Sequence, residues 1–185
     1  MRVISGLARG VALKTPEGML TRPTADRVKE ALFSIIQFEL PGAKVLDLFG
    51  GTGQLGIEAL SRGASRAVFV DQREDACKLI RENLRRTKLD GCAAVVRSDY
   101  LAYLDRCKEK FSIIFLDPPY SEVFLENALK RITEIDILQS GGIIVTERPA
   151  GKELPWEFPN FSRSKDYKYG KTILTIYRKI DDPQV

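Results

Sequence analysis

The stretch KVLDLFGGTGQLG, from Lys44 to Gly56, decides the fold of this chain. It begins as a short apolar run that ends in Asp47, continues through a glycine-rich turn, and enters helix-compatible sequence at Gln54. A glycine turn between a strand and a helix lets a ligand lie against bare backbone, with the first N–H groups of the helix directed at its polar end. The stretch therefore predicts a strand, a tight turn and a helix that together bind a ligand.

Apolar runs that end in an acid recur along the chain. AVFVDQ reaches Asp71, CAAVVRSD reaches Asp99, and FSIIFLDPPY reaches Asp117 before its two prolines. Segments with helical periodicity separate these runs. Near-continuous apolar strands that alternate with helices predict a parallel sheet with helices on both faces. The acids are then expected along one edge of the sheet, at the carboxyl ends of the strands.

The remaining segments complete the predicted domain. RPTADRVKEALFSII predicts a helix with Thr24 as its N-cap. IIVTE (Ile143 to Glu147) predicts a fifth strand after a turn at Gly141 and Gly142. TILTIYRK (Thr172 to Lys179) predicts a final antiparallel strand, because no helix precedes it.

The N-terminal segment differs from the rest of the chain. Residues 2–14 consist of short mixed segments broken by Gly6 and Gly10, which predicts a small hairpin or an extended arm with no evident core. We therefore expect an arm over residues 1–22, followed by one α/β domain over residues 23–185.

Composition limits the chemistry that this chain can perform. Its 185 residues include no histidine, which removes the commonest metal ligand and general base. We therefore expect no metal site, and chemistry that comes from carboxylates, backbone or a cofactor. The three cysteines lie in separate segments without a metal-binding pattern. Apolar runs are shorter than a membrane span, and the N-terminus lacks the apolar core of a signal peptide, which predicts a cytoplasmic protein with no membrane partner.

Basic residues gather in two parts of the chain. The net charge is +4 and the isoelectric point is about 9.0, which suits an anionic partner without requiring one. Residues 1–22 carry four basic residues against one acid, and residues 162–171 also carry four against one. The basic N-terminal segment predicts contacts with phosphate groups.

The glycine turn favours a cofactor that contains a nucleoside. Gly51, Gly53 and Gly56 satisfy the spacing GxGxxG. Asp71 follows about 20 residues later, where a carboxylate receives ribose hydroxyls. A dinucleotide and S-adenosylmethionine both carry an adenine ribose, so these residues alone leave both cofactors open.

Acids at two further strand ends separate these cofactors. Asp47 would repel a pyrophosphate but suits the cationic amino acid end of S-adenosylmethionine. Asp99 ends the third strand, where it can receive the adenine amino group. The combination favours S-adenosylmethionine.

The segment Asp117-Pro118-Pro119-Tyr120 carries the sharpest chemical signal. Its prolines remove two N–H donors and hold the turn rigid, so its carbonyls remain free to accept from a ligand. The exocyclic amine of a nucleobase donates two hydrogen bonds. Acceptance by the Asp117 carboxylate and the Pro118 carbonyl would orient that amine and stabilise the positive charge that develops as it attacks a methyl group. Tyr120 offers a face on which an extruded base can stack.

With these motifs the sequence resembles class I S-adenosylmethionine-dependent methyltransferases, and closely resembles the RsmD family of 16S rRNA guanine-N2 methyltransferases. The resemblance runs through RVISGLARG, RPTADRVKEALFSII, VLDLFGGTGQLGIEALSRGA, VFVD, DPPY and YGKTILTIY. It implies a Rossmann-like, seven-stranded and mostly parallel sheet whose last strand is antiparallel, with helices on both faces. It also implies a small N-terminal β-hairpin that contacts RNA.

The resemblance further implies roles for individual residues. The implied cofactor-binding residues are Asp47, Gly50, Gly51, Gly53, Asp71 and Asp99. The implied residues around the target amine are Asp117, Pro118 and Tyr120, and those near the substrate entrance are Arg22, Thr24 and Arg27. The implied cofactor is S-adenosylmethionine, and the implied partner is 16S rRNA within an assembling small ribosomal subunit.

Other functions remain open on the sequence. Closely related proline turns serve enzymes that methylate adenine N6 in DNA or a protein glutamine, although this chain has no separate DNA-recognition domain. A non-catalytic RNA-binding module of the same fold is another alternative, against which the intact glycines and Asp117 argue. A hydride-transferring Rossmann enzyme is the last, and the DPPY segment has no role in it.

Overall fold

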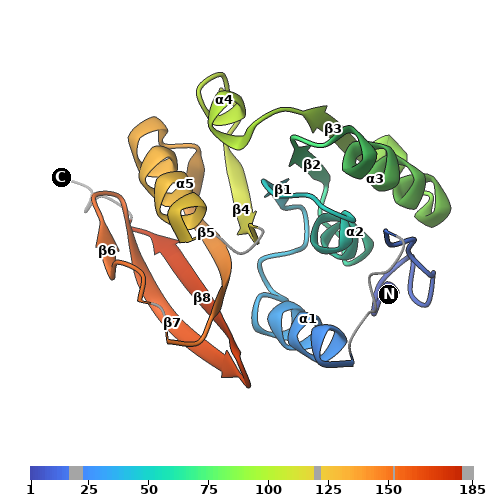
Figure 1. Ribbon diagram of the computed structural model, residues 1–185, viewed down its shortest axis with the longest axis horizontal. Coiled ribbons are helices and arrows are strands. Elements are labelled where there is room, and N and C mark those ends of the chain that lie inside the picture. The colour runs from blue at the N-terminus through green and yellow to red at the C-terminus, as the bar shows by residue number, and fades with distance from the viewer. Residues whose placement is uncertain (17–22, 119–121, 152, 181–185) are drawn as a thin grey trace.

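An eight-stranded sheet with helices on both faces forms the centre of the protein (Figure 1). The structure is a computed structural model in which residues 1–16, 23–118, 122–151 and 153–180 are described. The strands are β1 (Lys44–Asp47), β2 (Arg66–Asp71), β3 (Ala93–Arg97), β4 (Phe111–Leu116), β5 (Leu138–Pro149), β6 (Glu157–Phe158), β7 (Phe161–Tyr169) and β8 (Thr172–Lys179). The helices are α1 (Pro23–Ile35), α2 (Gln54–Ser61), α3 (Glu74–Thr87), α4 (Tyr100–Leu104) and α5 (Glu122–Ile135), with a short 3-10 helix η1 (Asp90–Cys92).

The order of the strands fixes where a ligand can bind. The sheet runs β3-β2-β1-β4-β5-β8-β7-β6. Strands β1 to β5 are parallel, whereas β8 lies antiparallel between β5 and β7. The predicted fold class is thus confirmed, and the two-residue β6 adds one strand at the edge. The chain order reverses between β1 and β4, the point at which open sheets of this kind bind their ligands.

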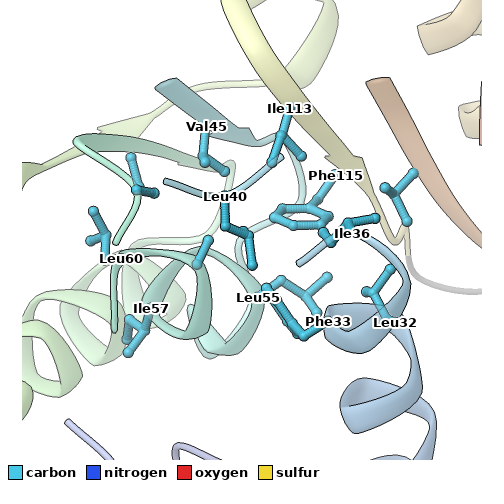
Figure 2. Packing of buried hydrophobic residues seen from close by; sticks show 14 of the residues in the cluster. Leu32, Phe33, Ile36, Leu40, Val45, Leu55, Ile57, Leu60, Ile113 and Phe115 are labelled. Atoms are coloured by element: carbon cyan, nitrogen blue, oxygen red, sulfur yellow. The ribbon is translucent and has the colours of Figure 1, made fainter. Parts of the chain in front are cut away.

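Two hydrophobic clusters hold the helices to opposite faces of the sheet. Helices α1, α2 and α3 contribute to one cluster, in which the Phe33 ring centre lies 5.9 Å from that of Phe115 (Figure 2). Helices α4 and α5 contribute to the other, in which Leu104 and Leu129 share a cluster with Leu116. Successive residues of β4 therefore face opposite layers, as the two-residue period of a strand requires.

The N-terminal arm is packed into the domain. Val3, Ala8 and Leu13 are buried in the same cluster as α1, α2 and α3. The expectation of an arm with no core is therefore wrong. The arm doubles back through an antiparallel bridge between Arg2 and Ala12. The Val3 N–H donates to the Val11 carbonyl and the Leu13 N–H to the Met1 carbonyl, each at 3.0 Å, so the predicted small hairpin is present without regular strands.

A buried carboxylate holds this arm in place. Glu58 of α2 accepts hydrogen bonds from the backbone N–H groups of Ile4, at 2.8 Å, and Ser5, at 3.0 Å. The Arg62 Nε donates to the same carboxylate at 2.8 Å, and the Lys29 Nζ lies 3.8 Å from it. The Glu58 side chain is almost completely buried, and every one of these contacts brings it a donor or a positive charge. The arm is thus attached through polar contacts. Such contacts produce no helical or strand periodicity by which the sequence could predict them.

Two local predictions differ from the structure. Helix α1 begins at Pro23, so Thr24 lies inside the first turn and is not the N-cap. Proline suits the first helical position, because it has no N–H to satisfy there. Gly141 and Gly142 lie within β5 instead of in a turn, where the register between β4 and β5 shifts. Among the described residues, no helix has both the length and the apolar character required to cross a membrane.

Candidate active site

The carboxyl ends of the central strands open into one large cavity. Its volume is about 850 Å³. The glycine turn lines it, together with the acids Asp47, Asp71, Asp99, Asp117 and Glu147. The cavity lies where the strand order reverses, and it brings together all four acids that the sequence places at strand ends.

Backbone geometry explains the glycines of the turn. Gly51 and Gly53 have φ values of +55° and +79°, which side chains disfavour. A Cβ atom at Gly56 would lie 2.3 Å from the Phe69 ring, so glycine is required for α2 to pack against β2. Of the predicted cofactor-binding glycines, Gly50 and Gly51 line the cavity. Gly53 is not among the lining residues, and it shapes the turn directly before α2.

Asp47 is a buried acid at the end of β1. One of its oxygens accepts a hydrogen bond from the Gly56 N–H at 3.1 Å. Burial raises the pKa of this carboxyl to about 8, against the effect of that hydrogen bond, and the negative charges of Asp117 and Asp71 raise it further. A positively charged group in the cavity would stabilise the ionised form of Asp47. The site therefore has an electrostatic preference for a cationic ligand group near β1.

Asp71 and Asp99 follow β2 and β3. The Asp71 carboxylate accepts from the Gly51 N–H at 3.0 Å and from the Arg73 N–H at 2.9 Å, which ties it to the glycine turn. The Asp99 Oδ1 accepts from the N–H groups of Leu101 and Ala102. Asp99 is thus the N-cap of α4, a helix that the sequence analysis did not predict. Capping uses one oxygen of Asp99 and leaves the other available at the cavity.

The DPPY segment contributes Asp117 and Pro118 to the cavity. Burial raises the pKa of the Asp117 carboxyl above its ordinary range. Within the described part of the chain, this carboxylate has no hydrogen-bond or ion-pair partner. Pro119 and Tyr120 lie outside the described residues, so the stacking role of Tyr120 stays a prediction.

Glu147 is an additional acid in the cavity that the sequence analysis left without a role. Leu116 pairs with Thr146 in the register of β4 and β5, so Asp117 and Glu147 follow side by side. Burial raises the pKa of Glu147, and the charge of Asp117 raises it further. The signal was present in the sequence, because IIVTE is another apolar run that ends in an acid. Over the described ranges, no group of three or more histidines, cysteines or acids could hold a metal ion.

Three aromatic side chains form an apolar wall of the cavity. Phe49 of the turn, Tyr100 of α4 and Phe124 of α5 all line it. The ring centre of Tyr100 lies 5.2 Å from that of Phe49 and 5.6 Å from that of Phe124. Such a wall can pack against a flat aromatic ligand ring. The sequence analysis missed it, because its members come from three separate elements.

Of the three residues predicted near the substrate entrance, only Arg27 has a described side chain. Arg22 lies outside the described residues. The backbone of Thr24 belongs to the first turn of α1, but its side chain is outside the described part. Arg27 is exposed on α1 and is not among the residues that line the cavity. Their contact with a substrate stays a prediction.

Comparison with known proteins relates nearly the whole chain to one family. The model of the family described as "Conserved hypothetical protein 95" matches residues 1–178. The chain belongs to this family. Ribosomal RNA small subunit methyltransferase D of Escherichia coli (strain K12) is 31% identical over 179 residues, which cover 97% of this chain and 90% of that protein. The Bacillus subtilis (strain 168) protein YlbH, provisionally named an rRNA methyltransferase, is 41% identical over 97% of this chain and 99% of its own length. The resemblance seen in the motifs is thereby confirmed.

Solved structures of similar proteins agree with the fold of this family member. The Escherichia coli protein yhhF, provisionally described as a methyltransferase, has a TM-score of 0.88 and 29% sequence identity, with coverage of 98% of this chain and 99% of that one. A hypothetical protein of Thermus thermophilus has a TM-score of 0.81 and 33% identity, with coverage of 95% of this chain and 98% of that one. The chain therefore has the methyltransferase fold over nearly its full length.

Proposed function

We propose that this protein transfers a methyl group from S-adenosylmethionine to the exocyclic N2 amine of a guanine in small-subunit (16S) rRNA. It is a methyltransferase of the same family as the small-subunit rRNA methyltransferases D. One observation carries the proposal. Asp117 and Pro118, with acceptors suited to an amine, lie in the same cavity as the glycine turn and its acids.

The residues of the cavity fit S-adenosylmethionine. Asp47 is a buried carboxylate that a cationic amino group would stabilise in its ionised form, and it would hold the amino acid end. Asp71, tied to the glycine turn, would receive the ribose hydroxyls. The oxygen of Asp99 that does not cap α4 would accept from the adenine amino group, beside the aromatic wall. When bound, the cofactor supplies an electrophilic methyl group on a sulfonium centre.

Asp117 and Pro118 perform the positioning that the reaction needs. The lone pair of a guanine N2 amine is delocalised into the ring, so the amine is a poor nucleophile. The Asp117 carboxylate and the Pro118 carbonyl each accept one N–H of the amine, which fixes its orientation and stabilises the positive charge that develops on nitrogen. The raised pKa of Asp117 also suits its carboxylate to hold the proton that the amine then loses.

The partner follows from the family and from charge. The named relatives include methyltransferases of small-subunit rRNA. The net charge of +4 suits a polyanion. We extend this to 16S rRNA within an assembling small subunit, in the cytoplasm, with Arg22, Thr24 and Arg27 near the entrance of the substrate. Tyr120 would stack on the extruded base.

Label transfer tests this function. The protein is incubated with labelled S-adenosylmethionine and small subunits from a strain that lacks this enzyme, and the nucleosides are then separated. We expect label in N2-methylguanosine, and no label when the particles come from a strain that contains the enzyme. Label in protein would support methylation of a glutamine, and label in N6-methyladenine when DNA replaces the subunits would support the DNA alternative. No transfer combined with no cofactor binding by calorimetry would identify a non-catalytic RNA-binding module.

A further inference from the structure

We propose that Glu147 selects guanine by accepting a hydrogen bond from its ring N1–H, while Asp117 and Pro118 hold the neighbouring N2 amine. This inference rests on the proposed function and adds the residue that determines base identity. It gives a role to Glu147, an acid in the cavity to which the proposed contacts with the cofactor and the amine assign none.

The register of two strands places the two carboxylates together. Parallel strands β4 and β5 pair Phe115 with Val145 and Leu116 with Thr146. Asp117 and Glu147 follow as the next step of both strands, where neighbouring chains lie about 4.8 Å apart. Phe115 and Val145 both belong to the cluster on the α1 side of the sheet. By the two-residue alternation of strands, Asp117 and Glu147 leave the sheet on that same side.

The Glu147 carboxylate is available to a ligand. Among the residues that the structure describes, it has no hydrogen-bond or ion-pair partner, and it lines the cavity. The adjacent cation Arg148 follows on the opposite face of the strand, and its guanidinium donates to Asp166 at 2.7 Å and to Thr175 at 3.2 Å. Burial raises the pKa of Glu147, and the charge of Asp117 raises it further. A substrate with N–H donors would supply the hydrogen bonds that the Glu147 carboxylate lacks.

The chemistry of the bases makes this pair of acceptors selective. In guanine the N2 amine stands next to a ring N–H, so the edge presents adjacent donors. In adenine and cytosine the ring nitrogen beside the exocyclic amine is an acceptor. A carboxylate opposite that nitrogen would be repelled and left without a partner in a buried site, which is how sites reject analogues that lack a donor. Two acceptors side by side therefore fit guanine alone among the amine-bearing bases.

A base analogue tests the contact directly. 2-Aminopurine keeps the N2 amine but has an unprotonated N1 that accepts instead of donating. Small subunits are assembled from rRNA that carries guanine or 2-aminopurine at the methylated position. The rate of label transfer is then measured with the wild-type protein, with Glu147→Gln, and with Glu126→Gln, a control at an exposed position on α5. The glutamine amide can donate to the N1 of 2-aminopurine, which the carboxylate cannot do.

We expect the wild-type preference for guanine over 2-aminopurine to shrink by about tenfold or more in Glu147→Gln, and to stay unchanged in Glu126→Gln. The loss of the O6 atom in 2-aminopurine affects all three proteins alike and cancels in the comparison. The affinity for S-adenosylmethionine and the melting temperature report separately on folding.

Two results would overturn the inference. An unchanged preference in Glu147→Gln, or equal losses on both bases with cofactor affinity retained, would show that Glu147 does not contact N1. Such a result leaves the proposed function intact, because wild-type protein still methylates guanine. Wild-type protein that transfers no label to guanine would overturn the inference and the proposed function together.

Discussion

Two groups of acids in this protein, one buried and one half-buried, differ in their hydrogen-bond partners. Glu58, beneath the N-terminal arm, accepts from two backbone N–H groups and from Arg62, with Lys29 close by. Asp117 and Glu147, at the carboxyl edge of the sheet, have no hydrogen-bond or ion-pair partner among the described residues. The fold itself supplies hydrogen-bond donors to Glu58. For Asp117 and Glu147, a ligand would supply them.

This difference distinguishes an acid that stabilises the fold from acids that can bind a ligand. A buried carboxylate with its donors contributes to a defined structure, and removal of either side leaves uncompensated groups. A carboxylate that the fold leaves unpaired has a raised pKa and marks a place where a ligand makes the missing contacts. Four experiments test whether the two groups behave in these different ways.

The largest effect is expected for Asp117→Ala. Loss of an acceptor that stabilises developing charge lowers the rate constant of methyl transfer by about 10³-fold. Cofactor affinity, measured by calorimetry, is expected to change little, because the contact proposed for Asp117 is with the amine. Asp90→Ala, at an exposed position, is the matched control. Equal loss of methyl transfer and cofactor binding would show that Asp117 is structural.

The next largest effect is expected for Glu58→Ala. The substitution leaves the N–H groups of Ile4 and Ser5 without their acceptor and Lys29 without its counter-charge, so the free energy of unfolding falls by about 3 kcal/mol. Urea denaturation measures the change, with Glu126→Ala as the control. A decrease of less than about 1 kcal/mol in the free energy of unfolding would show that this contact stabilises the protein no more than a surface ion pair does.

The pH dependence of methyl transfer gives a smaller effect. Asp117 and Glu147 accept hydrogen bonds most strongly when ionised, and burial raises the pKa of both. Acids with raised pKa values take up protons at higher pH, so activity falls as the pH falls. We expect a loss of about tenfold between pH 7.5 and 5.5, whereas a carboxyl near its ordinary pKa of about 4 would stay ionised there.

The matching control for this profile is Glu147→Gln. Removal of one negative charge lowers the pKa of the other carboxyl, so the acid limb of the guanine reaction moves to lower pH. Cofactor affinity is followed over the same range to separate binding from transfer. A flat profile in the wild-type protein would contradict the raised pKa values.

Asp47→Asn is expected to change how stability depends on pH. The pKa of Asp47 is about 8 in the folded protein and about 4 in the unfolded chain. The folded state therefore binds the extra proton, and wild-type stability falls as the pH rises from 4 to 8. The variant removes this loss, so without cofactor its stability relative to wild type rises as the pH rises from 5 to 8. It also binds S-adenosylmethionine more weakly. Thermal unfolding of both proteins at pH 5 and pH 8 checks the sign of this change. A variant whose stability relative to wild type does not rise over this range would contradict the prediction.

Sequence patterns predicted the site because strand ends are easy to read. Asp47, Asp71, Asp99 and Asp117 each end an apolar run, and parallel topology then collects such ends at one edge. Glu147 also ends an apolar run, but it lies outside the motifs that carry the family resemblance.

Long-range contacts were beyond prediction. Val3 and Leu13 are buried without any helical or strand period, because Glu58 and other polar groups far along the chain fix the arm. The aromatic wall depends in the same way on elements that meet only in three dimensions. The sequence predicts that the Asp99 side chain binds adenine. Its role as the N-cap of α4 depends on local hydrogen bonds that an aspartate can make but does not always make.

The position of β8 has a consequence for biosynthesis. Because β8 lies between β5 and β7, the sheet cannot be completed in the order in which the ribosome makes its strands. Until Lys179 has been added, β5 presents an unpaired edge and β7 has no connection to the parallel strands (Figure 1). Open edges recruit strands from other chains. A nascent chain that stalls before Thr172 is therefore exposed to aggregation, with the acids of its active site already synthesised.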